Sequence, residues 1–386
     1  MKRDLYGHEQ RYKNWKENVI KHGEDELTKK NSDILLKFIF DMELGINVSS
    51  LSKKGARSPH RLNALRQKLV QIIKFLQKRK VKDITKVKRE ELMQLFNDMR
   101  TGVIKTKNGT LYKSTGDYVK DFKAFWAWWR KINRLKTPSI HIENIVEDLD
   151  RTGEKPKWVH LTDQQIKKLL KNSIEKYTSL FEFAYDTGAR PTEIFSVLGR
   201  DITQDKKGVY VNFRNEASKT FGRKIKLQLS GETILKYIKD NDIKDEDYLF
   251  SFTSFAINKY LKELCFKLFG NKVSQAGNKF NQFSLYDWRH NSACFWVQRY
   301  KRNSDMMYRF GWKSEKYIFY YSEFLGMRDK IRDEDMYIDV TKTELEKEVE
   351  ELKKKVSKSV TKEEMMVLFK KAFEKTKQQK QIIEIR

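Results

Sequence analysis

Two arginines in different parts of the sequence are the residues best suited to do chemistry together. Arg190 ends a tight turn in the stretch TGARPTEI, and Arg289 lies in the stretch YDWRH, among many aromatic residues. A guanidinium buried among aromatics needs a partner, because an unpaired buried charge is costly. A guanidinium is planar and always charged, so it can hold two oxygens of a phosphate at once. Two such groups meeting in space would bind one phosphate and stabilise the charge that develops during its transfer.

Three further segments could complete such a site. Glu193 lies three residues after Arg190, on the same side of a helix, where the two can form an ion pair. Lys219 lies in the stretch NEASKTFGRKIKL, where a hairpin is expected to turn, and its ammonium could swing towards an anion. The stretch KYIFYY offers phenols as nucleophiles. Taken alone, these features also fit a structural ion pair, a solvated lysine and aromatic packing.

The elements that would hold these residues are mainly helical. Apolar residues recur at helical spacing in RLNALRQKLVQIIKFLQKRK and in KSTGDYVKDFKAFWAWWRKI, and no strand pattern interrupts this half. Thr162 and Gln165 form a capping pattern at the start of another helix. GVYVNFR and RKIKLQLS alternate like the arms of a hairpin, and helical patterns return after Asp247. We therefore predict a mainly α fold with a small antiparallel β-sheet.

The length of 386 residues predicts more than one domain. Pro138, Gly153 and Pro156 mark a linker between the two halves. Near the C-terminal end, heptad-like spacing indicates either a short coiled coil or a lone amphipathic helix that docks on a partner subunit. The predicted parts are a charged N-terminal arm (1–30), a helical DNA-clamping domain (31–137), a linker (138–157), a catalytic domain (158–335) and a helical tail for oligomerisation (336–386).

The charge balance indicates a polyanionic partner. Lys and Arg number 80 against 53 Asp and Glu, a net charge of +27. Such an excess is self-repelling unless a polyanion such as DNA or RNA neutralises it. A thermophilic surface rich in Lys and Glu would explain many charges of both signs but not this imbalance. No stretch of 18 apolar residues and no signal peptide is present, and the two cysteines have apolar surroundings, so we expect a cytoplasmic protein without a membrane partner.

The expected chemistry needs neither a metal nor another cofactor. Fixed cations can stabilise the charge on a transferring phosphodiester without a metal. The sequence has no carboxylate cluster of the kind used by two-metal nucleases, and its six histidines lack metal-ligand spacing. It also has no G-x-x-x-x-G-K-[ST] loop, which argues against the use of ATP.

In their order along the chain, these motifs resemble the catalytic domain of the tyrosine recombinase (phage integrase) family. That family shows T-G-x-R-x-x-E, a hairpin lysine, H-x-x-R-H, and then L-G-H with a tyrosine nine residues later. Here TGARPTEI, SKT, YDWRH and GW follow in the same order, and Trp312 precedes Tyr321 by nine residues. The helical half resembles the core-binding domain of the family, so the resemblance covers roughly residues 30–330.

The resemblance implies a role for each matching position. Arg190 and Arg289 would hold the non-bridging oxygens of the scissile phosphate, with Glu193 orienting Arg190. Lys219 would protonate the departing 5′-oxygen. Tyr321 would attack phosphorus and form a 3′-phosphotyrosyl enzyme. The residue that competes for this last role is Tyr320, and the residues implied to contact DNA are Lys113, Ser114 and Arg223.

The chain departs from the family pattern at two catalytic positions. Tyr286 replaces the first histidine, as in some archaeal members, and a phenol with a pKa of about 10 is the poorer base. Trp312 replaces the later histidine, and its indole can only donate a hydrogen bond. His290 follows Arg289 as in the family, where it more often supports packing than chemistry.

The function implied by the resemblance is that of an archaeal-type site-specific recombinase. Such an enzyme would integrate or excise a mobile element as a homotetramer on double-stranded DNA, in the nucleoid. Two alternatives remain open at this point. The chain could be an inactive descendant that only binds DNA, as the change at Tyr286 allows. It could also relax DNA like a type IB topoisomerase, which uses related chemistry.

Overall fold

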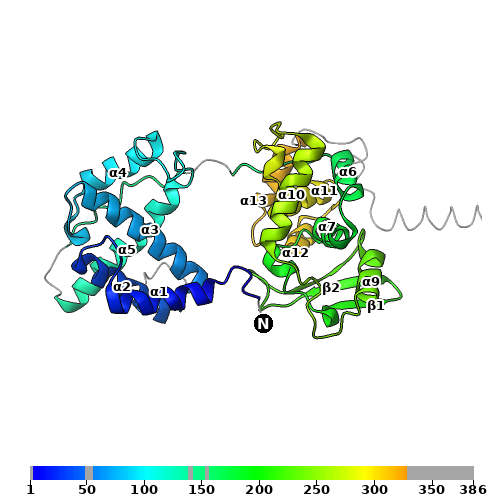
Figure 1. The fold of residues 1–386 in the computed structure, drawn as a ribbon, viewed down its shortest axis with the longest axis horizontal. Helices are drawn as coiled ribbons and strands as arrows, with labels where there is room; N and C mark the ends of the chain where they lie inside the picture. Colours follow the sequence, from blue (N-terminus) through cyan, green and yellow to red (C-terminus); the bar gives the residue numbers. More distant parts are fainter. Residues whose placement is uncertain (1–2, 48–54, 138–141, 153–155, 328–386) are drawn as a thin grey trace, which may run out of the picture. The chain divides into compact units, whose positions relative to one another are not determined.

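Helices dominate the described part of the chain in the computed structural model (Figure 1). The structure describes residues 3–47, 55–137, 142–152 and 156–327. The described residues up to Tyr321 belong to one compact unit, and the described residues 322–327 lie outside it. The predicted tail over 336–386 therefore lies outside the described residues. The boundaries at 157 and 335 remain predictions.

The N-terminal helices enclose a hydrophobic cluster that we call the first core, with members from Tyr12 to Leu149. The amphipathic stripe predicted around residues 61–80 lies on α3, where its apolar side chains are buried because they recur every three to four residues. Trp128 is buried in this core and donates its indole N–H to Asp41 at 2.7 Å. The helices are α1 (His8–His22), α2 (Lys29–Leu44), α3 (Pro59–Lys78), η1 (Ile84–Lys86), α4 (Arg89–Thr101) and α5 (Thr115–Lys136).

Two segments of this part differ from the sequence-based expectation. Residues 1–30 are not a simple charged arm, because α1 buries Tyr12 and Val19, two turns apart on one face. The Tyr12 hydroxyl also donates a hydrogen bond to Glu43 at 2.9 Å. Within the predicted linker, the described residues Ile145 and Val146 belong to the first core. Burial of their apolar side chains stabilises the folded state, and the first core therefore extends beyond residue 137.

The second core runs from Val159 to Trp288 and holds the elements of the predicted catalytic part. α7 packs against α11, where Trp288 stacks on Phe181 with ring centroids 5.4 Å apart. Thr162 caps α6, and its backbone N–H donates to Gln165 at 2.9 Å, as the capping pattern predicts. The helices are α6 (Asp163–Lys171), α7 (Glu175–Thr187), α8 (Pro191–Ile194), η2 (Gly199–Asp201), α9 (Gly231–Asp240), α10 (Ser254–Phe269), η3 (Phe280–Gln282), α11 (Leu285–Val297), α12 (Asn303–Phe310) and α13 (Lys316–Phe324).

An antiparallel sheet in the order β1-β2-β3 carries the segment that contains Lys219. The strands are β1 (Ile202–Asp205), β2 (Gly208–Phe213) and β3 (Arg223–Lys226). The predicted hairpin is confirmed, with Phe213 opposite Arg223 and Tyr210 opposite Lys226. β1 was not expected, because its sequence ITQD is short, mostly polar and without an apolar alternation.

The helices of the described segments are too short or too polar to cross a lipid bilayer.

Candidate active site

A left-handed turn at the end of α7 presents Arg190. Gly188 has φ 57°, and a Cβ added there would lie 2.2 Å from the ring of Phe310, so both the backbone and the packing require glycine. Pro191 then begins α8 with its fixed φ, at a position where a missing N–H costs nothing. The turn therefore fixes the direction in which the Arg190 side chain leaves the backbone.

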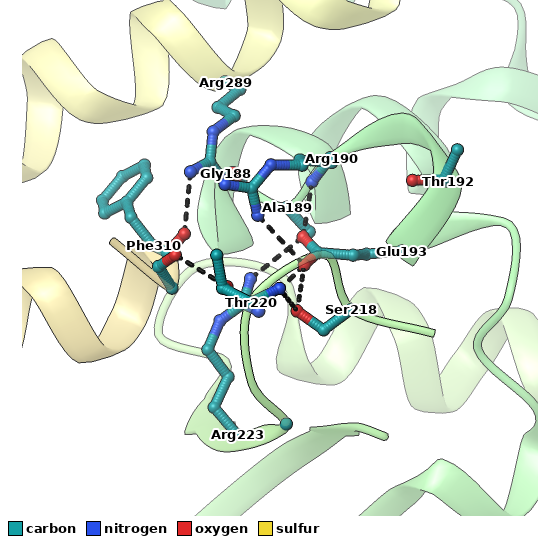
Figure 2. A network of polar contacts seen from close by, with 12 residues as sticks. Gly188, Ala189, Arg190, Thr192, Glu193, Ser218, Thr220, Arg223, Arg289 and Phe310 are labelled. Atoms are coloured by element: carbon teal, nitrogen blue, oxygen red, sulfur yellow. Dashed lines mark hydrogen bonds and ion pairs between the residues drawn. The ribbon is translucent and has the colours of Figure 1, made fainter. Parts of the chain in front are cut away.

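Glu193 accepts several of the hydrogen bonds in the polar network around this turn (Figure 2). One carboxylate oxygen accepts the backbone N–H of Arg190 at 2.8 Å, and the other accepts its guanidinium at 3.2 Å. The guanidinium of Arg223 donates to both oxygens at 3.1 Å. Burial opposes the charge on Glu193, but Arg223 and then Arg190 outweigh it and lower its pKa to about 2. The ion pair expected between Arg190 and Glu193 is thus present, with a second arginine bound to it.

Arg289 is buried on α11 without a carboxylate partner among the described residues. Its guanidinium donates to the carbonyl oxygens of Gly188 and Phe310, each at 2.7 Å. The ring centroids of Phe310 and Trp312 lie 5.4 and 5.8 Å from its central carbon. Burial and the nearby charge of Arg190 lower the pKa of Arg289 to about 10, so the group still carries its charge at neutral pH.

Arg190 and Arg289, which we call the arginine pair, come together from α11 and from the turn after α7. Figure 2 shows their guanidinium groups side by side, and the repulsion between them contributes to the low pKa of Arg289. Like charges are placed in contact only where another interaction opposes their repulsion. Glu193 supplies one negative charge, already shared with Arg223, so the arrangement suits a further anion.

Lys219 lies on the loop of residues 214–222 between β2 and β3, which we call the lysine loop. Its side chain is exposed, as a residue that acts on a bound ligand requires. The residues before and after it bond to groups next to the arginine pair. Ser218 donates its hydroxyl to Glu193 at 2.8 Å (Figure 2). Thr220 donates its hydroxyl to the carbonyl of Gly311 at 2.8 Å.

Tyr321 on α13 is buried, and its hydroxyl shares a 2.7 Å hydrogen bond with Nδ1 of His290. Burial raises the pKa of Tyr321, while the nearby Arg289 charge acts in the opposite direction. Burial also lowers the pKa of His290 to about 4, with a further contribution from Arg289. Both partners of this hydrogen bond are therefore uncharged at neutral pH, and the charge of Arg289 affects the pKa of both.

Aromatic rings fix the position of the Tyr321 phenol. Trp312 stacks on it with centroids 5.7 Å apart and planes 13° from parallel, and it is the same indole that lies over Arg289. On the other side, Trp158 stacks on His290 at 4.8 Å. The nine-residue spacing from Trp312 to Tyr321 thus corresponds to direct contact in space. Tyr286 differs from this group, because it is 49% exposed, with its ring against the edge of His290 at 5.4 Å.

The other two tyrosines of KYIFYY face different surroundings. The Tyr320 hydroxyl accepts the indole N–H of Trp158 at 2.8 Å. Tyr317 is 41% exposed and stacks on Trp312 at 5.5 Å. Of the three, Tyr321 is the one whose hydroxyl bonds to a residue adjacent to the arginine pair.

The residues predicted to contact DNA differ in their surroundings. Arg223 requires a correction, because its side chain is buried and held by Glu193 and by the carbonyl of Arg309 at 2.7 Å. Its charge is used inside the protein, where it neutralises Glu193, and not at the surface. Lys113 and Ser114 are exposed directly before α5, so their side chains are accessible.

Sequence reasoning missed the residues that tie these elements together. Ser218 and Thr220 stand on either side of Lys219, and that position was the signal that could have identified them. Arg309 on α12 forms a buried ion pair with Asp186 on α7 at 2.5 Å, and nothing in their sequence spacing indicates it. In the segments described, no three His, Cys, Asp or Glu side chains are grouped so that they could hold a metal ion.

Comparison with known proteins finds similarity at the level of structure. No family model matches the sequence, and no curated protein matches it either. A Tn1549 transposon integrase in complex with circular intermediate DNA is similar with a TM-score of 0.54 and 15% identity, over 81% of this chain and 99% of that one. The XerH site-specific recombinase bound to difH substrate has a TM-score of 0.51 and 14% identity, over 85% and 95%.

A lambda integrase dimer bound to a core site is also similar, with a TM-score of 0.51 and 17% identity, over 83% of this chain and 88% of that one. At such identities the likeness concerns the path of the chain and not the identity of site residues. The mainly helical architecture with a small antiparallel sheet, expected from the sequence, is confirmed. The chain has the fold of the tyrosine recombinases.

Proposed function

We propose that this chain is a site-specific DNA recombinase that cuts and rejoins duplex DNA through a 3′-phosphotyrosyl intermediate. The observation that carries the proposal is the arginine pair, in which Arg289 is buried without a carboxylate partner in the described segments and next to Arg190. A phosphodiester of DNA would supply the missing negative charge and accept hydrogen bonds from both guanidiniums. The net charge of +27 favours the same partner.

The proposed reaction is an in-line displacement at phosphorus. The hydroxyl oxygen of Tyr321 forms a bond to phosphorus while the bond from phosphorus to the 5′-oxygen breaks. Arg190 and Arg289 hold the two non-bridging oxygens, where charge builds up in the transition state. Lys219 donates a proton to the departing 5′-oxygen, which leaves as a hydroxyl. The reverse reaction with a different 5′-hydroxyl rejoins the strand, and the energy of the phosphodiester is kept in the covalent link.

The remaining residues of the site support these four. The phenolic proton of Tyr321 passes to Nδ1 of His290, which lies 2.7 Å away and is neutral at pH 7. Trp312 fixes the plane of the phenol by stacking. Tyr286 is exposed enough to donate a hydrogen bond to the phosphate. Glu193 keeps Arg190 extended towards the anion.

The biological setting follows from the resemblance to integrases and recombinases. We expect integration or excision of a mobile element, on double-stranded DNA, by a homotetramer in which Lys113 and Ser114 contact the duplex. Association through residues 336–386, an archaeal source and a place in the nucleoid are likewise expectations.

The proposal is tested by covalent trapping on suicide DNA. We would use a pool of duplexes with randomised sequence, supplemented with the DNA that flanks the gene. Each duplex carries a nick close to the 3′ side of the candidate cleavage positions. Cleavage releases a short 5′-hydroxyl fragment that diffuses away, so the 3′-phosphotyrosyl adduct accumulates and survives denaturation with detergent. Sequencing of the trapped DNA then identifies the substrate.

Two matched variants identify the nucleophile. Tyr321→Phe removes the hydroxyl bonded to His290, and we expect it to abolish the adduct. Tyr320→Phe removes a hydroxyl bonded to Trp158, and we expect the adduct to form. Sequence-specific binding without any adduct would contradict the proposal and favour an inactive DNA-binding descendant. Relaxation of supercoiled plasmid by a monomer, without sequence preference, would favour a type IB topoisomerase-like enzyme.

A further inference from the structure

The lysine loop is attached to the arginine pair on both sides of Lys219. On one side, Ser218 donates its hydroxyl to Glu193, whose same oxygen accepts the guanidinium of Arg190. On the other side, Thr220 donates its hydroxyl to the carbonyl of Gly311 at 2.8 Å. The carbonyl of the preceding residue, Phe310, accepts the guanidinium of Arg289. Ser218 thus connects the loop to Arg190 through Glu193, and Thr220 connects it to Arg289 through the backbone of residues 310–311.

The base of the loop is fixed separately from these two contacts. Asn215 accepts the backbone N–H of Gly222 through its side-chain oxygen at 2.6 Å, which closes the loop. The guanidinium of Arg214 forms an ion pair with Asp201 at 3.1 Å and donates a hydrogen bond to the carbonyl of Ser196 at 2.5 Å. Removal of the Ser218 and Thr220 hydroxyls would therefore loosen the tip around Lys219, while the base stays closed.

Proton transfer by Lys219 depends on where its ammonium lies. Its ammonium is exposed, and no hydrogen bond or ion pair involves it in the part of the chain that the structure describes. A lysine side chain carries about 2 kcal/mol of rotamer entropy, so little besides the backbone directs it. Proton transfer needs the donor within hydrogen-bond reach of the leaving oxygen, and a misplacement of about 1 Å can cost a factor of about 100.

We propose that Ser218 and Thr220 are positioning residues that hold Lys219 in register with the arginine pair, so that its proton is delivered to the departing 5′-oxygen. This inference rests on the proposed function. It concerns the leaving-group proton and not the charge on the non-bridging oxygens. A variant that loses the two hydroxyls therefore keeps the arginine pair and loses only the alignment of the acid.

A change of leaving atom separates these two effects. We would prepare the duplex recovered by covalent trapping in two forms, with oxygen or with sulfur at the 5′-bridging position of the scissile phosphate. A thiolate leaves without protonation, because the pKa of a thiol is far below that of an alcohol. Cleavage of the sulfur form therefore does not depend on Lys219, whereas it still depends on Arg190 and Arg289.

The variants are Ser218→Ala, Thr220→Val and the double substitution, with Thr203→Val on exposed β1 as the matched control. We expect the double variant to cleave the oxygen form about 10-fold to 100-fold more slowly than the unaltered protein. On the sulfur form we expect rates within about twofold of the unaltered protein, since no proton is needed. Lys219→Ala should show the same pattern, and adding it to the double variant should cause little further loss.

The motion of the loop gives a second measurement that needs no activity. Hydrogen exchange at the amides of residues 217–221 should be faster in the double variant than in Thr203→Val, with α11 unchanged. Equal slowing on both substrates, or unchanged rates on both, would overturn the inference. So would unchanged exchange in the loop. If the unaltered protein cleaves neither duplex, the proposed function is wrong and the catalytic part of this inference falls with it, while the exchange measurement still decides whether the hydroxyls hold the loop.

Discussion

The replacement of Glu193 by Gln tests whether one buried carboxylate holds the site together. The side chain is buried and bonds to Arg190, Arg223 and Ser218. Glutamine keeps the shape but has no charge, so two guanidiniums lose the anion that compensates them. It also places an amide donor where three donors already point. We therefore expect a folded but clearly destabilised protein.

The pKa of Glu193 gives the magnitude. Its fall from 4.5 to about 2 means that the folded protein favours the ionised side chain. At about 1.4 kcal/mol for each pH unit, the fall corresponds to roughly 3 kcal/mol of folding free energy at neutral pH. Loss of one partner from a buried ion pair costs a similar amount, about 3–5 kcal/mol. Because the folded pKa is lowered, this stability is fully present above pH 4.5 and is lost as the pH falls towards 2.

The assay is urea unfolding of both proteins, followed by tryptophan fluorescence between pH 7 and pH 3. At pH 7 the Glu193→Gln variant should be less stable by about 3 kcal/mol. The difference should shrink as the pH falls below 4.5, because the carboxyl of the unfolded chain takes up a proton there, whereas the folded protein keeps it ionised until about pH 2. All other carboxyl groups are common to both proteins and cancel. A difference that stays constant from pH 7 to pH 3, or that is below about 1 kcal/mol at pH 7, would refute the reasoning.

Three further predictions concern the same site. Arg289→Lys keeps a charge but replaces the planar fork, whose two nitrogens donate to Gly188 and Phe310, by a single ammonium, so we expect adduct formation to fall about 100-fold to 1000-fold, and a loss below about threefold would contradict the assigned role. Gly188→Ala should destabilise the protein by roughly 2 kcal/mol or more, because alanine is strained at φ 57° and its Cβ clashes with Phe310. Thermal unfolding measures this loss. Gly7→Ala is its control, since φ there is 60° with no atom within 4 Å, and equal losses for both would exclude the packing contribution. The rate of adduct formation should be level from pH 8 to about pH 6 and fall as the pH approaches 4, where His290 takes up a proton and no longer accepts one from Tyr321; a midpoint near 6.5 would show that His290 is not buried as described.

Local patterns in the sequence were sufficient for most elements. The apolar stripe of α3, the cap of α6 at Thr162 and the hairpin of β2 and β3 are found where the sequence predicts them. These features depend on neighbours within a few residues, so periodicity and capping chemistry reveal them. β1 was missed because its four residues are mostly polar, and the burial of α1 was missed because the helices that it packs against lie further along the chain.

Only part of the candidate site could be predicted from the sequence. Residue type singles out Arg190 and Arg289, since a buried guanidinium is unusual in a plain core, and the resemblance to the family singles out Tyr321. The sequence does not show which charged side chains are buried. Arg223 lies in a strand whose alternation cannot say which face is covered, and it proved to be the partner of Glu193 and not an exposed DNA contact.

The sequence by itself determined which groups this protein can bring to a phosphate, because charge, planarity and pKa belong to the side chains. It also determined the helices and the hairpin that carry them, through spacing and caps. Only the tertiary structure decided that Glu193 serves Arg190, Arg223 and Ser218 at once, and that His290 meets the hydroxyl of Tyr321. These contacts join segments up to 31 residues apart in the sequence. They depend on how the second core packs, and no local pattern encodes the distance between two side chains across a core.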